Sequence, residues 1–260
     1  MKISNPNIVS IFVGTAGGKP KVLKDMHKAI SLSPSLKISG PLVIDHDLRT
    51  ALYSGLPDGK GIVLIVGTGS AAWGVDKKGK EVLVSGWNHW LGETGGYELG
   101  IKAIIAATRS VDGRGEKTVL EKIVAEKFAL KDFEEISSLV KAPFVDSPKI
   151  ASLSPFVVQA ALSGDLVAKR IVKEMIDEMD CSVHAAARRA GLRNNLKVVL
   201  VGGIFRSKLN LVAHLKRRAR KWIKNVEFIF PHEEPAVTAF KFALKNAPNI
   251  KPFGSVHITA

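Results

Sequence analysis

The sequence predicts an α/β protein with a mixed sheet, and three observations point to this class. Short apolar runs of strand composition alternate with longer stretches whose apolar residues recur at helical spacing. Two of the runs, 71–76 and 81–87, flank Lys77-Lys78-Gly79-Lys80, which is typical of a hairpin. No low-complexity linker interrupts the 260 residues, and 46% of them are hydrophobic, so the chain can bury a sizeable core.

In the first half of the chain, the apolar period and the flanking turn residues define each element in order. The sequence predicts a strand near 8–13, a helix near 21–31, and a strand at 41–47 that leads directly into a short helix at 48–55. It continues with a strand at 62–66, the hairpin, a glycine-rich loop at 92–96, a helix near 97–109, a loop at 110–118 and a helix at 118–128.

The second half of the chain begins with a long helical region and then returns to alternation. The helical region spans roughly 155–190, with a break near Ser163-Gly164-Asp165, and leads to an apolar strand that ends in Gly202-Gly203. A basic helix over 214–225, a strand at 226–230 and a helix at 235–246 follow.

Basic residues outnumber acidic ones, and the formal net charge of +14 raises the question of nucleic-acid binding. Much of this charge lies in 214–225, where a helix would place four apolar residues on one face and the cations elsewhere. These apolar residues are Leu211, Leu215, Ala219 and Trp222. The favoured interpretation is the solvated face of an amphipathic helix, so a nucleic-acid partner is not expected. The alternative is a nonspecific polyanion-binding strip.

The cysteine count and the apolar pattern restrict the cellular context. The single cysteine, Cys181, excludes an intramolecular disulfide framework, a multi-cysteine zinc site and a cluster held by four thiolates of this chain. No window reaches 18 uninterrupted apolar residues, and the first residues show no convincing signal-cleavage site. We therefore expect a soluble cytoplasmic protein with no membrane partner.

Two familiar phosphate-binding motifs are absent. Gly17-Gly18-Lys19 fails as a Walker loop because Pro20 stands where Ser or Thr should hold magnesium, and the leading glycine is missing. A Rossmann fingerprint fails because no G-x-G-x-x-G opens a helix after the first strand.

Two strand ends carry glycines that could serve the same purpose. Gly67-Thr68-Gly69-Ser70 follows a predicted strand and offers consecutive backbone N–H groups with two hydroxyls, which suits a phosphate without a lysine. Gly202-Gly203 ends another strand, so the two turns could hold the two ends of a nucleotide. The alternative for the first turn is an ordinary glycine-rich hairpin shoulder.

Asp47 lies at the carboxyl end of a predicted strand, which is the usual position of site residues in an open α/β sheet. One interpretation is a general base that takes a proton from a hydroxyl attacking phosphorus. The other is a helix N-cap for the helix that starts at Leu48. The spacing alone leaves both open.

Five ordered motifs together resemble a known family. They are GIVLIVGTGSAAWGVDKKGK, SGWNHWLGETGG, DGRGEKT, AALSGDLVA and VVLVGGIFRS. Their order and separations, from Ile11 to about Leu244, resemble the N-acetylglucosamine kinase and archaeal hexokinase branch of the actin-like ATPase and sugar kinase superfamily.

The resemblance implies a ribonuclease-H-like actin-type ATPase fold of two lobes with mixed sheets. Residues 1–58 would be the remnant of a truncated N-terminal lobe, with a C-terminal helix at about 236–247 packing back on it, and 59–235 would form the C-terminal lobe. The implied activity is ATP-dependent phosphorylation of a hexose or amino sugar such as N-acetylglucosamine. ATP, Mg²⁺ and a small-molecule sugar are the implied ligands, and we expect a homodimer.

The resemblance also assigns site residues by position. Asp47 matches the catalytic aspartate, and no metal-ligating residue is assigned. The nucleotide-binding residues would be Gly67, Thr68, Gly69, Ser70, Gly202 and Gly203. The sugar-contacting residues would be Gly86, Trp87, Asn88, His89 and Glu93.

Two departures from the family pattern bear on activity. Gly92-Glu93-Thr94-Gly95-Gly96 stands where the family has G-D-E-G-S, which lengthens the carboxylate that holds sugar hydroxyls. The D-x-G-G-T first phosphate loop does not precede the strand at 8–13. The alternatives are a start upstream of Met1, which would restore the kinase, and a truncated, inactive relative that still binds sugar or nucleotide. A related activator-type ATPase ranks lower, because Ile65 and Val66 stand where those proteins carry cluster cysteines.

Overall fold

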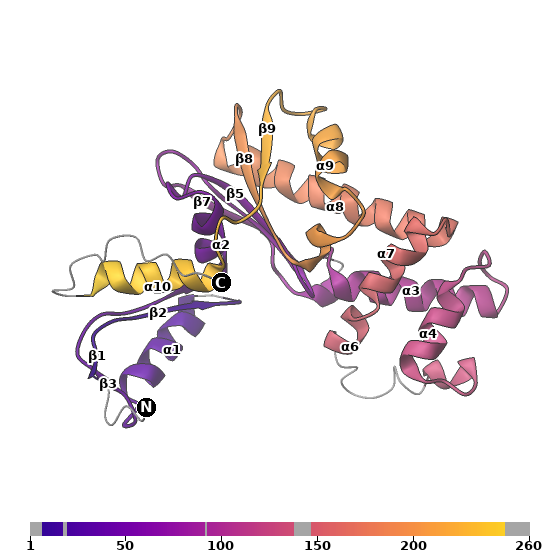
Figure 1. Ribbon diagram of the computed structural model, residues 1–260, viewed down its shortest axis with the longest axis horizontal. Helices are drawn as coiled ribbons and strands as arrows, with labels where there is room; N and C mark the ends of the chain where they lie inside the picture. The colour runs from indigo at the N-terminus through magenta and orange to yellow at the C-terminus, as the bar shows by residue number, and fades with distance from the viewer. Residues whose placement is uncertain (1–6, 18–19, 92, 138–146, 248–260) are drawn as a thin grey trace. The chain divides into compact units, whose positions relative to one another are not determined.

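The computed structural model describes residues 7–17, 20–91, 93–137 and 147–247, and the chain divides into two compact units. The first unit contains Met1–Gly59 and Pro231–Ala260, and the second contains Lys60–Phe230. Strands and helices alternate in both units, which confirms the predicted α/β class (Figure 1).

A five-stranded mixed sheet in the order β7-β6-β5-β8-β9 organises the second unit. β5 pairs antiparallel with β6 and β6 with β7, whereas β5 pairs parallel with β8 and β8 with β9. The strands are β5 (Gly61–Val66), β6 (Ser70–Val75), β7 (Glu81–Ser85), β8 (Leu196–Val201) and β9 (Val226–Ile229). The hairpin predicted around Lys77-Lys78-Gly79-Lys80 is the β6–β7 connection.

The centre of this sheet is the most deeply buried part of the unit. Ile62, Val63 and Leu64 of β5 are fully buried, as are Val198 and Val199 of β8. Continuous apolar runs of this kind are typical of strands whose two faces are both covered. The carboxyl ends of β5 and β8 therefore form a rigid base for the glycine turns that follow them.

Helices of the second unit surround the sheet and build a separate helical layer. They are α3 (Gly96–Val111), α4 (Leu120–Phe128), α6 (Ser147–Ala151), α7 (Ser154–Leu162), α8 (Leu166–Ala190) and α9 (Leu211–Ala219). The predicted break near residues 163–165 is confirmed, because Asp165 caps the start of α8. Within the described residues no single helix is long and apolar enough to cross a membrane. In the part of the chain that the structure describes, one pair of helices, Ser147–Leu162 and Leu166–Ala190, is long and apolar enough when taken together, but it is bent by 116°.

The basic helix predicted over 214–225 is wrong at both ends. The helix begins at Leu211 and ends at Ala219. After it the Trp222 N–H donates to the Ala219 carbonyl at 3.0 Å, which is a hydrogen bond of a turn and not of an α-helix. Trp222 therefore leaves the predicted apolar face and stacks on His184 of α8, with ring centroids 4.5 Å apart. Its indole N–H donates to Asp180, so a tertiary contact overrides the helical period.

Smaller corrections concern two other element boundaries. The strand predicted near 8–13 is split into β1 (Asn7–Ile8) and β2 (Ile11–Thr15), because β1 pairs with β3 (Lys37–Ile38) and β2 pairs with β4 (Leu42–His46). The helix predicted to begin at 118 begins at Leu120, and the backbone N–H of Val119 before it donates to Asp165.

The first unit is small, and its helices cover two short parallel strand pairs. Its helices are α1 (Pro20–Ser31), α2 (Asp47–Gly55) and α10 (Pro235–Asn246). The ring of Phe242 in α10 lies 5.1 Å from the rings of both Phe12 in β2 and Tyr53 in α2. The C-terminal helix thus packs on the N-terminal segments of the chain (Figure 1).

Candidate functional site

The turn between β5 and β6 exposes backbone donors at the end of the buried central strand. The Gly67 N–H donates to the Gly69 carbonyl at 2.8 Å and closes the turn. Within the described residues, the N–H groups of Thr68 and Gly69 have no hydrogen-bond partner. A side chain at Gly67 would meet nothing within 4 Å, so the turn faces open space. Consecutive free N–H groups of this kind form a concave site for an anion.

The glycine-rich segment after residue 92 packs directly on this turn. The N–H groups of Gly96 and Tyr97 donate to the carbonyls of Gly67 (2.8 Å) and Thr68 (2.9 Å). Gly95 has φ 156°, and a Cβ there would lie 2.6 Å from the Thr68 carbonyl oxygen. Only glycine fits at Gly95, and the start of α3 thereby fixes the Gly67–Ser70 turn. Gly92 of the same motif lies outside the described residues.

The turn after β8 approaches the end of β5 even more closely. Gly202 has φ 133°, and a Cβ on it would lie 1.9 Å from the Val66 carbonyl oxygen. A side chain on Gly203 would meet nothing within 4 Å. The two glycine turns predicted from the sequence therefore lie side by side at the carboxyl ends of adjacent parallel strands, where open α/β sheets bind ligands.

A cavity of about 560 Å³ opens between these turns and the helical layer. Its polar end is formed by Gly67, Thr68, Gly95, Gly96 and Gly203. Its walls are formed by apolar and several polar side chains of α3, α6, α7, α8 and the segment after Gly203. These residues are Leu99, Ala151, Ser154, Pro155, Val158, Gln159, Leu162, Met175, Ile204, Arg206, Ser207 and Lys208. An apolar chamber of this size with a few convergent polar groups is typical of a small-molecule site.

The residues of the cavity walls were not predicted from the sequence. α6 and most of α7 contribute residues from a region with no local motif, so only the tertiary structure brings them to the glycine turns, whereas Leu162 at the end of α7 belongs to AALSGDLVA. Arg206 and Ser207 belong to the motif VVLVGGIFRS, so a signal for these two residues was present in the sequence.

Buried hydroxyls near the cavity lack partners within the described residues. Ser70 is 7% exposed and Thr94 is fully buried, yet neither side-chain oxygen makes a hydrogen bond. The Ser207 hydroxyl in the cavity wall is also unpaired. Because an unsatisfied buried hydroxyl costs about 1–3 kcal/mol, these groups are expected to pair with a ligand or ordered water.

The segment predicted to contact sugar forms a tight loop beside the Gly67–Ser70 turn. The Glu93 carboxylate accepts the backbone N–H of Trp87 at 2.6 Å, and the Asn88 side chain accepts that of Trp90 at 2.9 Å. His89 Nε2 lies 2.9 Å from the Ser147 hydroxyl, and a Cβ on Gly69 would touch His89 at 3.3 Å. The structure therefore places Gly86 and His89 against the turn, with the Gly86 N–H donating to the Ser70 carbonyl at 3.1 Å, whereas Trp87 is 78% exposed. Glu93 accepts the Trp87 N–H through Oε1, so its Oε2 takes no part in this hydrogen bond.

Asp47 lies in the first unit, at the first residue of α2 and directly after β4. The helix cap interpretation is wrong, because His46 is the N-cap and its Nδ1 accepts the Arg49 N–H at 3.2 Å. The neighbouring Asp45 pairs with Arg49 and accepts the His46 N–H at 2.7 Å. Within the described residues the Asp47 carboxylate makes no hydrogen bond or ion pair and is partly exposed.

Comparisons with known proteins agree with this geometry. Residues 1–243 match the model of the BadF/BadG/BcrA/BcrD ATPase family. The chain belongs to this family. It is 37% identical over 221 residues to the N-acetylmuramic acid/N-acetylglucosamine kinase of Clostridium acetobutylicum, covering 82% of this chain and 69% of that protein. It is 29% identical over 246 residues to the N-acetyl-D-glucosamine kinase of Dictyostelium discoideum, covering 91% and 76%.

A solved structure with the same fold supports membership of the actin-like ATPase fold. It is a Chromobacterium violaceum protein provisionally named an N-acetylglucosamine kinase, with a TM-score of 0.65, 21% identity, and coverage of 92% of this chain and 78% of that one. The predicted fold class and family resemblance are confirmed.

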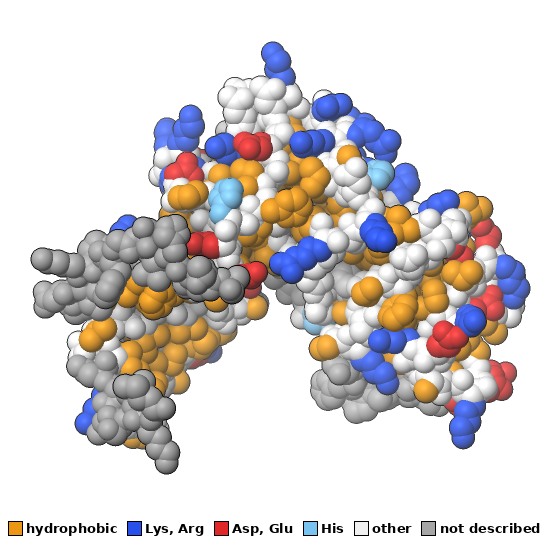
Figure 2. Space-filling model, viewed as in Figure 1, with side chains coloured by type: hydrophobic (Ala, Val, Ile, Leu, Met, Phe, Trp, Pro, Cys, Tyr) orange, Lys and Arg blue, Asp and Glu red, His pale blue; other side chains and the backbone are white. Residues whose placement is uncertain are grey.

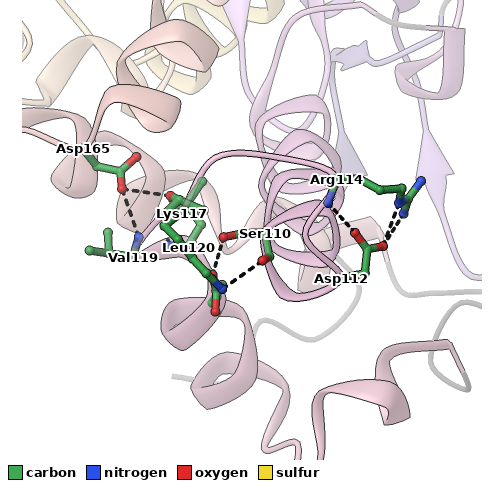
Figure 3. Close-up of polar contacts among 9 residues, drawn as sticks. Ser110, Asp112, Arg114, Lys117, Val119, Leu120 and Asp165 are labelled. Atoms are coloured by element: carbon green, nitrogen blue, oxygen red, sulfur yellow. Dashed lines mark hydrogen bonds and ion pairs between the residues drawn. The ribbon is translucent and has the colours of Figure 1, made fainter.

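Two further motifs of the sequence, DGRGEKT and AALSGDLVA, meet at Asp165 (Figure 3). Asp165 belongs to AALSGDLVA, and Thr118 is the last residue of DGRGEKT. Asp165 Oδ2 accepts the Thr118 hydroxyl at 2.8 Å and the Val119 N–H at 2.9 Å, and Oδ1 accepts the Ala168 N–H at 2.8 Å. One carboxylate therefore holds the starts of α4 and α8 together. Burial raises the pKa of Asp165, but the hydrogen bonds from Ala168, Val119 and Thr118 outweigh it and leave the pKa below its ordinary value.

Replacing Asp165 by Ala is expected to destabilise this unit by about 2 kcal/mol, because it removes a helix cap and two further charge-assisted hydrogen bonds. The lowered pKa means that this contribution is present above the unfolded-state pKa of about 4 and is lost as the pH falls through the folded-state value. Urea unfolding at pH 7 and pH 3 measures both effects. Asp112→Ala is the control, since its partner Arg114 lies two residues away in the same exposed loop. Equal losses at both pH values would contradict the assignment.

Proposed function

We propose that the chain is an ATP-dependent kinase that phosphorylates an amino sugar, with N-acetylglucosamine as the first candidate. The observation that carries the proposal is the Gly67–Ser70 turn, which has free N–H groups at Thr68 and Gly69 and lines a nucleotide-sized cavity with Gly67 and Thr68. The names of the Clostridium and Dictyostelium relatives support the choice of substrate.

The cavity residues fit ATP on chemical grounds. The free N–H groups of Thr68 and Gly69, with the unpaired Ser70 hydroxyl, suit phosphate oxygens. The walls formed by residues such as Leu99, Val158 and Ile204 suit an aromatic base. Mg²⁺ would bind mainly through phosphate oxygens and water and would neutralise their charge.

Asp47 is the proposed general base. Its carboxylate takes the proton of a sugar hydroxyl, the hydroxyl oxygen forms a bond to the γ-phosphorus, and the bond from that phosphorus to the ADP oxygen breaks. The N–H groups of the Gly67–Ser70 turn stabilise the negative charge on the transferring phosphoryl group. The Gly86–His89 loop and Glu93 hold the sugar, and Glu93 fixes the loop through the Trp87 N–H.

The direct test is transfer of labelled γ-phosphate from ATP to a panel containing N-acetylglucosamine, N-acetylmuramic acid, N-acetylmannosamine and glucose. The panel is measured with this chain and with a version extended upstream of Met1 in the gene. Transfer to an N-acetylated amino sugar in preference to glucose is expected. Binding of ATP and sugar by both proteins without any transfer would overturn the kinase assignment.

Ser70→Ala tests the proposed phosphate contact separately from folding. Its hydroxyl has no partner within the described residues, so removal should leave thermal stability unchanged or slightly raised. Loss of one hydrogen bond to a phosphate should raise the KM for ATP by about tenfold. Ser182→Ala is the matched control, because this buried hydroxyl pairs with Ser85 at 3.0 Å and lies outside the cavity. It should lower stability without changing the KM.

A further inference from the structure

A second, strongly basic cavity lies at the opposite end of β8 from the nucleotide site. Its volume is about 460 Å³, and it is formed where β8 and β9 begin and α9 ends. Four cations line it, with one carboxylate and two amides: Lys197, Lys216, Arg220, Lys224, Glu227, Asn195 and Asn225. β8 spans six residues, so about 20 Å separates its two ends. Figure 2 shows Lys and Arg side chains gathered over the α9 region.

The four cations of this basic groove are unpaired within the described part of the chain. None of them forms a side-chain hydrogen bond or an ion pair there, whereas the adjacent Arg218 pairs with Asp177. Only Glu227 offsets their charge in the groove wall. Holding four like charges around one cavity is unfavourable unless an anion occupies it.

The helix dipole explains only part of this arrangement. Lys216 and Arg220 lie at the C-terminal end of α9, where cations are stabilised by the dipole. Lys197 comes from β8 and Lys224 from the segment after the helix, so neither is explained in this way. Three separate segments therefore bring positive charge to one concave site.

The lining also restricts the kind of anion. No aromatic residue lines the groove, so it offers no surface on which a nucleic-acid base could stack. Asn225 Nδ2 donates to Asn195 Oδ1 at 3.0 Å and leaves further amide hydrogens for an acceptor at the rim. We propose that this basic groove is a binding site for a compact phosphate compound with several negative charges, such as a polyphosphate or a sugar phosphate.

The test uses inorganic tripolyphosphate and calorimetry on the full chain, with the double variant Lys197→Gln/Lys224→Gln. The variant is expected to bind tripolyphosphate at least about tenfold more weakly while its affinity for ATP stays unchanged, because neither lysine lines the nucleotide cavity. Lys77→Gln/Lys78→Gln removes the same charge from the exposed β6–β7 turn and should leave binding within about twofold. Glucosamine 6-phosphate is titrated in parallel to distinguish a sugar phosphate from a polyphosphate.

Three results would overturn the proposal. Equal weakening in both double variants would mean that only the net charge matters. An unchanged affinity in the groove variant would place tripolyphosphate elsewhere. Tighter binding of duplex DNA than of either compact phosphate, lost in the groove variant, would assign the groove to a polyanion surface instead.

Discussion

Replacing Asp47 by Asn is expected to lower kcat for phosphate transfer by about 100-fold or more and to leave the KM values nearly unchanged. The amide cannot accept the proton of the attacking hydroxyl, but it keeps the size and shape of the carboxylate. Rates with the preferred sugar, measured at saturating ATP, give the effect directly.

The structure makes this variant unusually informative because Asp47 has no competing structural role. His46 caps α2 and Asp45 binds Arg49, so the Asn side chain breaks no observed contact. The loss of a negative charge at a helix N-terminus should cost only about 0.5 kcal/mol. Asp25→Asn, on the exposed face of α1 in the same unit, is the matched control and should change neither stability nor kcat. Near-normal turnover in Asp47→Asn would refute the general-base role.

Most of the second unit could be predicted from the sequence, because its signals are local. The buried β5 and β8 appear as uninterrupted apolar runs, and the hairpin and both glycine turns have short, recognisable sequences. The two turns lie side by side because β5 and β8 pair in parallel. No local sequence pattern predicts that these two strands pair.

The errors arise where a distant residue determines the local structure. Asp180 and His184 on α8 hold Trp222 and thereby remove it from the predicted helix. The Val119 N–H at the start of α4 donates to the distant Asp165, and the Arg49 N–H goes to His46 rather than to Asp47. Part of the apolar wall of the cavity comes from α6 and the start of α7, whose sequences carry no chemical signature.

The second large effect is expected from Gly202→Ala, which should destabilise the second unit by roughly 3–5 kcal/mol. The added Cβ would lie 1.9 Å from the Val66 carbonyl oxygen, and φ 133° is strained for any residue with a side chain. Relief requires the ends of β5 and β8 to separate, and this movement also displaces the Gly67–Ser70 turn that follows β5. Affinity for ATP should therefore fall together with the urea midpoint.

Gly203→Ala separates packing from ligand binding at the adjacent residue. Its Cβ would meet nothing within 4 Å and its φ is not in the positive range, so stability should change by less than about 1 kcal/mol. Because Gly203 lines the cavity, the added methyl group occupies ligand space and should weaken ATP binding without moving the urea midpoint. If both variants unfolded at the wild-type midpoint, the close approach of β8 to β5 would not hold. If ATP affinity survived in Gly203→Ala and in Ser70→Ala, the nucleotide would have to bind elsewhere.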